Sequence, residues 1–383
     1  MCVLTLCLSF DPLNDCLVLS TQELYFFIHI YFSRLIIQIN LTTITHIMEF
    51  KQIHPTYSKQ INNETESNNE TTINQPRLEW PEGRSGHSLC ADDNFLYLFG
   101  GYNPDDSHAI YRKLWRYNTS SRTWLVLPDQ DELAPRTGAS ISMVYWNRKL
   151  ITFGGTGYPF ANSNSNCISM YCLQTYKWYD LTKIALDQAI ARGRDENEIK
   201  VQQCGCTAIR NAPPRSKYGQ SMTVSPSGKV YIFAGTIGRE FENDMHSFCL
   251  KNLHWTQHDF CFAHRQSVPA PRYRHSVVCK DDRFFVLGGA TSSRAHGFAR
   301  FHLFNFGKKT WKSVKSIAHG DEAHGAVLYP GARHSQVCAG YKDKVYLIGG
   351  NDPICERYLN DVWELDLRTL QWSLIEVSKN FFL

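Results

Sequence analysis

Short runs of apolar and aromatic residues alternate with turns rich in glycine and polar residues along most of the chain. Five of these runs end in a glycine pair, or once in Ala-Gly: YLFGG at 97–101, ITFGG at 151–155, YIFAG at 231–235, FVLGG at 285–289 and YLIGG at 346–350. A short apolar run bounded by glycine predicts a buried β-strand. The pattern therefore predicts an all-β protein built from a repeated unit.

A tryptophan follows every glycine pair after 20 to 23 residues, and successive pairs are 54 to 80 residues apart. The five tryptophans are Trp124, Trp178, Trp255, Trp311 and Trp372. This period is close to the roughly 50 residues of kelch units, which the residues resemble. Each unit begins with a basic stretch such as RSGHS and includes a third strand such as LWRYN, so four antiparallel strands are expected per unit.

Such units bury little surface alone and pack radially against their neighbours. We therefore predict a kelch-type β-propeller with five recognisable four-stranded blades, as part of an incomplete six-bladed ring. The tryptophans are expected to fill the gaps between blades, in preference to forming a ligand platform, because large aromatic side chains dominate core burial.

The composition excludes several classes of protein. The chain has 383 residues, 43% hydrophobic and 20% charged, with a net charge of +4. This balance supports a large core and gives no overall attraction to nucleic acid. Thirteen cysteines form no disulfide-like framework, which favours a reducing compartment, and the cytoplasm and nucleus are predicted. Cys204 and Cys206 lack a second pair at zinc-binding spacing, so neither a metal nor a cofactor is predicted.

The chain divides into three parts. Residues 1–47 are apolar, but polar residues interrupt the stretch Leu24 to Ile37, so no run reaches the roughly 18 apolar residues of a spanning helix and no membrane is expected. We expect translation to start at Met48, with 1–47 a gene-model artefact; an amphipathic anchor is the alternative. Residues 48–79 are predicted to form a disordered polar leader, and 80–383 the propeller.

An insert at 183–211 breaks the period of the repeat. Its middle, ALDQAIARGRDENEIK, is compatible with a short charged helix over the channel mouth or with a solvated loop, and the loop is favoured.

Antiparallel alternation places the glycine pairs, the links between blades and the basic starts of the innermost strands on one face, called here the glycine-pair face. The basic side chains expected around its channel mouth are Arg84, Arg136, Arg215, Lys217, Arg272, Arg274 and Arg333, with His87, His275 and His334. Six of these are arginines, expected at equivalent positions of the repeat. Tyr102, Tyr158, Tyr218 and Tyr273 are expected to line part of the same funnel.

Arginine binds both oxygens of a carboxylate at once, so a funnel of this kind suits a carboxylate ligand. The predicted peptide-binding residues are Arg84, His87, Tyr102, Arg136, Arg215, Tyr218, Arg272, Arg274, His275 and Arg333. In the structural alternative, each arginine pairs with an acid of the next blade, such as Asp105, Asp106 or Asp244. The sequence contains no Gly-rich phosphate loop, nucleophile elbow or HExxH pair, so a non-catalytic recognition module is expected.

Several strings are more specific than the generic repeat: RSGH, LYLFGGYNPD, KLWRYN, FGGTGYPF, YGQSM and RYRH, all between 84 and 275. They resemble the kelch domain-containing protein 10 family. The resemblance implies a substrate-recognition subunit of a cullin-2 RING E3 ubiquitin ligase that binds C-terminal degrons, with elongin B/C and cullin-2 as partners. It also implies a sixth blade and an elongin-binding box, which the residues after Trp372 do not supply. The alternative is a kelch scaffold or adaptor that binds a folded partner, of actin-associated or signalling type, over the blade sides.

Overall fold

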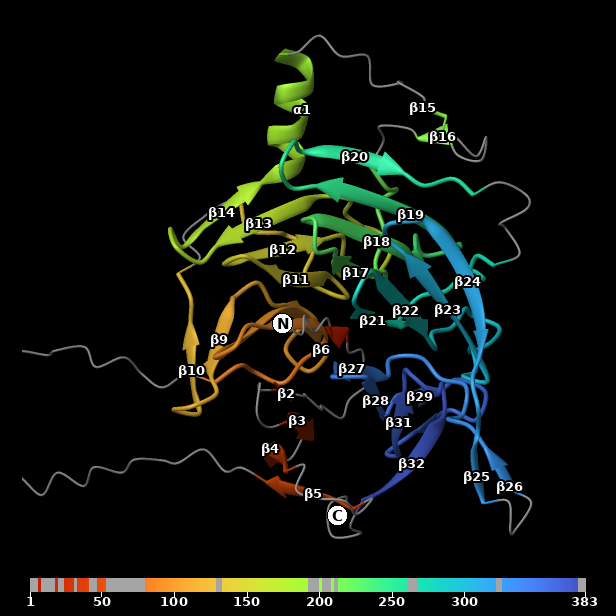
Figure 1. Ribbon diagram of the computed structural model, residues 1–383. Coiled ribbons are helices and arrows are strands. Elements are labelled where there is room, and N and C mark those ends of the chain that lie inside the picture. Colours follow the sequence, from red (N-terminus) through yellow and green to blue (C-terminus); the bar gives the residue numbers. More distant parts are fainter. Residues whose placement is uncertain are drawn as a thin grey trace, which may run out of the picture.

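The computed structural model describes residues 80–128, 133–191, 213–260, 267–321 and 326–377, together with the backbone of short strands outside these ranges. Five units of four antiparallel strands stand radially around a central axis as the blades of a β-propeller, and in the first and fifth blades further strands join the sheet (Figure 1). The predicted all-β kelch propeller with five blades is therefore confirmed.

Within each blade the strands follow the chain from the centre outward. The first blade consists of β6 (Ser85–Ala91), β7 (Phe95–Asn103), β9 (Trp115–Asn118) and β10 (Thr123–Val126). The second consists of β11 (Ser142–Trp146), β12 (Lys149–Phe153), β13 (Ile168–Cys172) and β14 (Lys177–Asp180). The third consists of β17 (Ser221–Val224), β18 (Lys229–Thr236), β19 (Phe241–Cys249) and β20 (His254–Gln257). The fourth consists of β21 (Ser276–Lys280), β22 (Arg283–Leu287), β23 (Arg300–Asn305) and β24 (Thr310–Lys315). The fifth consists of β27 (Val337–Tyr341), β28 (Lys344–Ile348), β31 (Val362–Asp366) and β32 (Trp372–Val377).

The repeated tryptophans lie in the cores between blades, as predicted. All five are buried. Four pack against an aromatic ring of the preceding blade, with ring centroids 4.9 to 5.8 Å apart: Trp178 on Phe99, Trp255 on Phe153, Trp311 on Phe233 and Trp372 on Phe298. Each of these four tryptophans therefore closes the boundary that its own blade shares with the one before it, whereas Trp124 packs on Trp115 and Tyr117 of its own blade.

The glycine pairs join each blade to the next. The N–H of the second glycine donates to a carbonyl at the start of the following blade, from Gly101 to Gly138, Gly155 to Lys217, Gly235 to Arg272 and Gly289 to Arg333, at 2.9 to 3.0 Å. At Gly155 the φ of +88° and a virtual Cβ only 2.5 Å from the Thr137 carbonyl oxygen both require glycine. The repeat of the sequence is thus a repeat of contacts between blades.

A second set of main-chain bonds runs around the channel mouth. One residue at the start of each blade has a φ between +51° and +64°: Gly86, Ser140, Gly219, Arg274 and Ser335. From the second blade onward, its N–H donates to the carbonyl of the corresponding residue in the preceding blade, at 2.7 to 3.2 Å. We call these five residues the inner ring.

The smaller elements lie in the loops. They are β8 (Ala109–Ile110), β15 (Lys200–Val201), β16 (Ala208–Ile209), β25 (His319–Asp321), β26 (Ala326–Leu328), β29 (Asn351–Asp352) and β30 (Arg357–Tyr358).

The favoured loop at the start of the insert was wrong, because α1 (Leu181–Ala191) is a helix. The Asp180 side chain accepts from the Lys183 N–H at 2.9 Å, a bond that caps the helix N-terminus. Leu181 is buried and Ile184 packs against the core between the second and third blades. The helix projects from the outer edge of the ring and does not cover the mouth (Figure 1). Residues 192–199 of the insert, and Cys204 and Cys206, lie outside the described residues.

Five strands precede the first blade: β1 (Leu6–Cys7), β2 (Val18–Leu19), β3 (Leu24–Ile30), β4 (Ser33–Asn40) and β5 (Ile47–Gln52). β5 pairs in parallel with β32, and β1 pairs antiparallel with β6. β2 to β5 lie between the fifth and first blades in Figure 1. Residues 53–79 of the predicted leader lie outside the described residues, and the start at Met48 stays a prediction. Within the described part, no helix has the length and apolarity needed to cross a membrane.

Candidate functional site

Three of the predicted arginines share one buried position. Arg84, Arg272 and Arg333 stand two residues before the inner-ring residue of their blades and are 5%, 4% and 1% exposed. Each Nη1 donates to the carbonyl of the first glycine of its pair, at 2.9 to 3.1 Å. Each Nε donates to the carbonyl two residues earlier in the chain, at 2.8 to 3.0 Å. These guanidinium groups therefore tie the start of a blade to the end of its second strand.

The expectation of six arginines at equivalent positions was wrong. The second blade has Gly138 and the third has Lys217 at this position, whereas Arg136 and Arg215 precede it by two residues and are exposed. Arg274 belongs instead to the inner ring. The sequence spacing does not show which basic residues are buried, which are exposed and which belong to the inner ring. Each basic stretch is only a few residues long, and the inner-ring turn sets the direction in which its side chains point.

Most of these cations have an acid within their own blade. Arg84 pairs with Glu82 at 2.7 Å and stacks 4.0 Å above the ring of Tyr111. Arg215 pairs with Glu240 and Glu242, both at 3.0 Å. Arg333 forms a two-point pair with Asp361, which holds the pKa of that carboxyl below its usual range although burial opposes it. Exposed Arg136 has no ion pair with any described residue.

The predicted histidines lie behind the mouth. His87 and His275 are 5% and 2% exposed. His275 Nε2 is hydrogen-bonded to Ser221 Oγ at 2.7 Å, and burial lowers its pKa well below the usual value. His275 is therefore neutral at pH 7 and supports the boundary between the third and fourth blades.

Arg274 is the predicted arginine that reaches the mouth without an acid. It makes no ion pair with any described residue, and its buried Nε has no hydrogen-bond partner there. Its guanidinium lies 5.1 Å from the ring centre of Tyr273, whose ring is 6.0 Å from that of His334. Burial and the charge of Arg274 lower the pKa of His334 to about 4. Burial raises the pKa of Tyr218, and the nearby Arg274 opposes this shift. We call Arg274, Tyr218, Tyr273 and His334 the mouth cluster.

An exposed aromatic patch lies at the boundary of the first two blades. It consists of Tyr102, His108, Tyr158 and Phe160, with ring centroids 4.1 to 5.9 Å apart. The Tyr102 hydroxyl and His108 Nδ1 are hydrogen-bonded at 2.6 Å. The sequence predicted Tyr102 and Tyr158 at the funnel but missed Phe160, although the FGGTGYPF string that marks this loop contains it.

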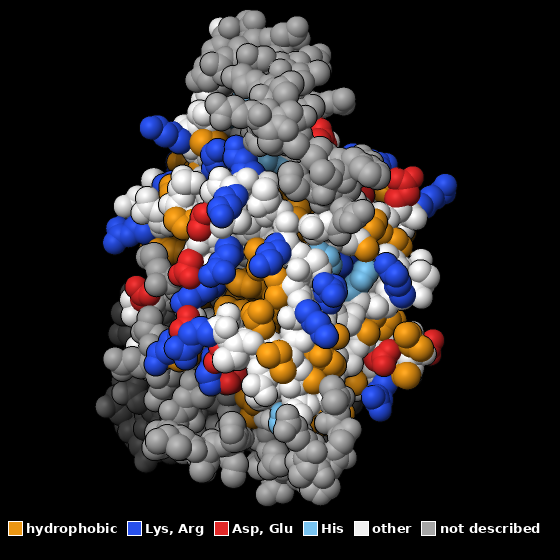
Figure 2. All heavy atoms as spheres, turned by 45° about the vertical axis from the view of Figure 1, so that its right-hand side comes forward, with side chains coloured by type: hydrophobic (Ala, Val, Ile, Leu, Met, Phe, Trp, Pro, Cys, Tyr) orange, Lys and Arg blue, Asp and Glu red, His pale blue; other side chains and the backbone are white. Residues whose placement is uncertain are grey.

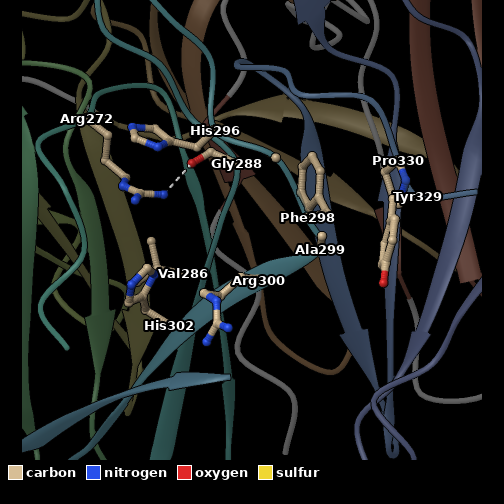
Figure 3. Close-up of a pocket in the computed structure, with 11 residues that line it drawn as sticks. Arg272, Val286, Gly288, His296, Phe298, Ala299, Arg300, His302, Tyr329 and Pro330 are labelled. Atoms are coloured by element: carbon tan, nitrogen blue, oxygen red, sulfur yellow. Dashed lines mark hydrogen bonds between the residues drawn. The ribbon is translucent and has the colours of Figure 1, made fainter. Parts of the chain in front are cut away.

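The fourth blade contains a cavity of about 380 Å³ that reaches the linker to the fifth blade. In Figure 3 the side chains of Arg272, His296, Arg300 and His302 lie around this cavity, with Phe298 and Tyr329 toward the fifth blade. Burial lowers the pKa of Arg272 to about 9 and those of His296 and His302 to about 4.

Arg272 was predicted as a site residue, whereas His296, Arg300 and His302 were not. The available signal was the concentration of basic residues in RAHGFARFH, which follows the fourth glycine pair. On the face shown in Figure 2, basic and histidine side chains lie near the centre among exposed hydrophobic groups, and acidic ones lie mostly toward the edges.

Comparison with known proteins agrees with this architecture. The KLHDC2/KLHL20/DRC7 Kelch-repeats domain matches residues 56–203 and 195–381. Kelch domain-containing protein 10 of Xenopus laevis is 32% identical over 306 residues, which cover 76% of this chain and 65% of that protein. The human protein of the same name is 31% identical over 305 residues, covering 76% and 60%. The Drosophila melanogaster homolog is 27% identical over 317 residues, covering 78% and 48%.

The predicted resemblance to kelch domain-containing protein 10 is thereby confirmed. The matched part spans less than two thirds of the length of each of these relatives. With its repeated glycine pairs, blade-joining tryptophans and matching domain model, this chain belongs to the kelch-repeat family described by the KLHDC2/KLHL20/DRC7 domain.

Proposed function

We propose that this chain is the substrate-recognition subunit of a cullin-2 RING ubiquitin ligase and that its mouth cluster binds the C-terminal carboxylate of substrate proteins. The ligase assembly, with elongin B/C and cullin-2, rests on the resemblance to kelch domain-containing protein 10. The proposed location in cytoplasm and nucleus rests on the thirteen cysteines, which form no disulfide-like framework. The role is recognition, with no chemistry performed by the propeller.

The observation that carries the proposal is Arg274. Arg274 is only partly buried at the channel mouth and makes no ion pair with any described residue, so its guanidinium charge can pair with an anionic ligand. A carboxylate satisfies such a group through charge-assisted hydrogen bonds. The hydroxyl groups of Tyr218 and Tyr273 belong to the same cluster and are potential donors to the second oxygen. The exposed rings of Tyr158 and Phe160 provide apolar surface for the preceding residues of a peptide.

The first test is a fluorescence-polarisation titration with labelled peptides that end in Pro-Gly or in an alanine tail, each as the free acid and as the amide. We expect the free acid to bind and amidation to weaken binding by roughly 10- to 100-fold, the value of a hydrogen-bonded charge. Equal affinities of the two forms would contradict the proposal.

The matching variant is Arg274→Ser. Serine already occupies the inner ring at Ser140 and Ser335 with the same positive φ, so the substitution is compatible with the backbone. We expect loss of peptide binding with an unchanged Tm. Arg239→Ser, which removes an exposed arginine from the loop after the third blade's Ala-Gly pair, is the control and is expected to bind normally.

A scaffold that binds a folded partner over the blade sides is the second candidate. Leu186 and Ile190 of α1 favour it, because they are 49% and 69% exposed at the outer edge of the ring. If this function holds, Leu186→Asp with Ile190→Asp should abolish capture of the partner, whereas Arg274→Ser should leave it intact.

A further inference from the structure

The blades can be compared residue by residue because their second and third strands pair in the same way. The residue two places before the glycine pair faces His246 in the third blade, His302 in the fourth and Trp363 in the fifth. Two residues earlier on these third strands stand Asp244, Arg300 and Asp361. Arg300 therefore occupies the position at which the neighbouring blades carry an aspartate.

In the third and fifth blades that aspartate neutralises the buried cation of the blade start. Lys217 Nζ lies 2.6 and 2.7 Å from the two carboxylate oxygens of Asp244. Arg333 contacts both carboxylate oxygens of Asp361, at 2.8 Å for Nη2. Both blades thus show a carboxylate at one defined place beside the buried cation.

The fourth blade has the cation but no such carboxylate. Arg272 is 4% exposed. Among the described residues it donates to the carbonyls of Ala270 and Gly288 and makes no ion pair. Four further basic residues lie near Arg272: Arg294, His296, Arg300 and His302. A buried charge is strongly unfavourable without a counter-ion.

The missing aspartate leaves space. The cavity of about 380 Å³ lies beside Arg272 and Arg300, with His296 above and His302 below in the view of Figure 3. A volume of this size lies within the range of small-ligand sites. Both histidines are neutral at pH 7 and add no charge of their own. The Nε2–H of His296 donates to the Pro271 carbonyl at 3.3 Å, whereas His302 has one ring N–H to donate.

We propose that this cavity is a carboxylate-binding site, in which a ligand from outside the chain takes the place that Asp244 and Asp361 fill in the neighbouring blades. The carboxylate belongs either to an acidic side chain of a bound protein or to the C-terminus of a bound peptide. The second source rests on the recognition of C-termini proposed above and would place the C-terminus in this cavity in place of the mouth cluster. The site itself depends on neither source.

The test is the Tm of the whole chain in sodium acetate against sodium chloride at equal ionic strength. Acetate at about ten times its Kd is expected to raise the Tm by roughly 2 °C, and the rise is expected to saturate with concentration. Arg300→Asp restores the aspartate of the other blades. It is expected to raise the Tm without acetate and to remove the response to acetate.

Lys312→Asp, which makes the same change of charge at an exposed position of β24, is the control and should respond to acetate as the wild type does. No acetate-specific rise in the wild type would overturn the proposal. So would an Arg300→Asp protein that keeps the acetate response.

Peptide binding to Arg300→Asp separates the two sources. Loss of the free-acid peptide assigns the cavity to the peptide C-terminus, whereas retained peptide binding with a lost acetate response assigns it to an acidic side chain. An acetate response in a wild-type protein that binds no C-terminal peptide would support the cavity and contradict the proposed function.

Discussion

The pair between Arg333 and Asp361 provides a quantitative test of how the fifth blade is held together. Asp361→Asn keeps the shape of the side chain and removes its charge, which leaves Arg333 buried at 1% exposure without a counter-ion. Breaking a buried pair in this way costs about 3–5 kcal/mol. Arg333 keeps its bonds to the carbonyls of Gly331 and Gly349, and the Asp361 side chain is 29% exposed, so the lower end of the range applies.

We therefore expect Asp361→Asn to lower the free energy of unfolding by about 3 kcal/mol and the Tm by roughly 4–5 °C. Equilibrium unfolding in urea measures the first value and calorimetry the second. Glu364→Gln is the matched control on the same strand. It weakens a pair with Lys344, whose side chain is 42% exposed, and is expected to cost less than about 1 kcal/mol.

The pH dependence gives a second readout. The pKa of Asp361 is lowered in the folded state, so its contribution is fully present above the unfolded pKa of about 4 and is lost as the pH falls through the folded pKa. The difference between wild type and Asp361→Asn should be constant from about pH 5 to 7 and shrink below about pH 4. Equal costs for Asp361→Asn and Glu364→Gln would refute the reasoning.

Three further perturbations test the fold. Gly155→Ala places a methyl group 2.5 Å from the Thr137 carbonyl oxygen at a φ of +88° and should cost about 2 kcal/mol or more in urea unfolding. Trp372→Ala empties the boundary between the fourth and fifth blades and should cost about 3–5 kcal/mol by the same measurement. Burial lowers the pKa of His258 to about 3 in the folded state. As the pH falls below the unfolded pKa of about 6.5, the unfolded state takes up a proton first, so the free energy of unfolding decreases. Between about pH 6.5 and 4 this histidine should contribute a loss of up to 1.4 kcal/mol per pH unit, and His258→Asn should flatten that slope.

Each of these perturbations has an outcome that contradicts it. A Gly155→Ala protein as stable as wild type would show that the backbone at Thr137 moves away from the added methyl group at little cost. A cost below about 1 kcal/mol for Trp372→Ala would place this side chain outside the core. An unchanged pH slope in His258→Asn would mean that this histidine is charged in the folded protein.

The fold was readable from the sequence because each repeat encodes contacts that recur. The glycine pair marks a strand end with positive φ, and the tryptophan marks the outer strand that packs on the preceding blade. Both signals are local and strong. The helix α1 was missed because its stability comes from the Asp180 cap and from burial of Leu181 and Ile184 against a neighbouring blade, which no local pattern in a charged segment reveals.

The site was only partly readable. The sequence shows that an arginine stands at a strand start, but its role depends on a residue far along the chain. Arg333 is neutralised by Asp361, 28 residues later, whereas Arg272 meets Arg300 at the same distance. Register between the second and third strands decides this pairing, and register becomes visible only once the strands are aligned. Arg274 was predicted for the mouth, but its unpartnered Nε is a property of the packed structure.

The inner ring has a consequence for which side chains the channel mouth can present. Its hydrogen bonds join main-chain atoms alone, so they do not depend on the side chain, provided that the residue tolerates a positive φ. Glycine, serine and arginine all occupy it here with the same backbone conformation. Single substitutions at these five positions by residues that tolerate this φ can therefore change the chemistry of the mouth at little cost to the main-chain ring that surrounds it.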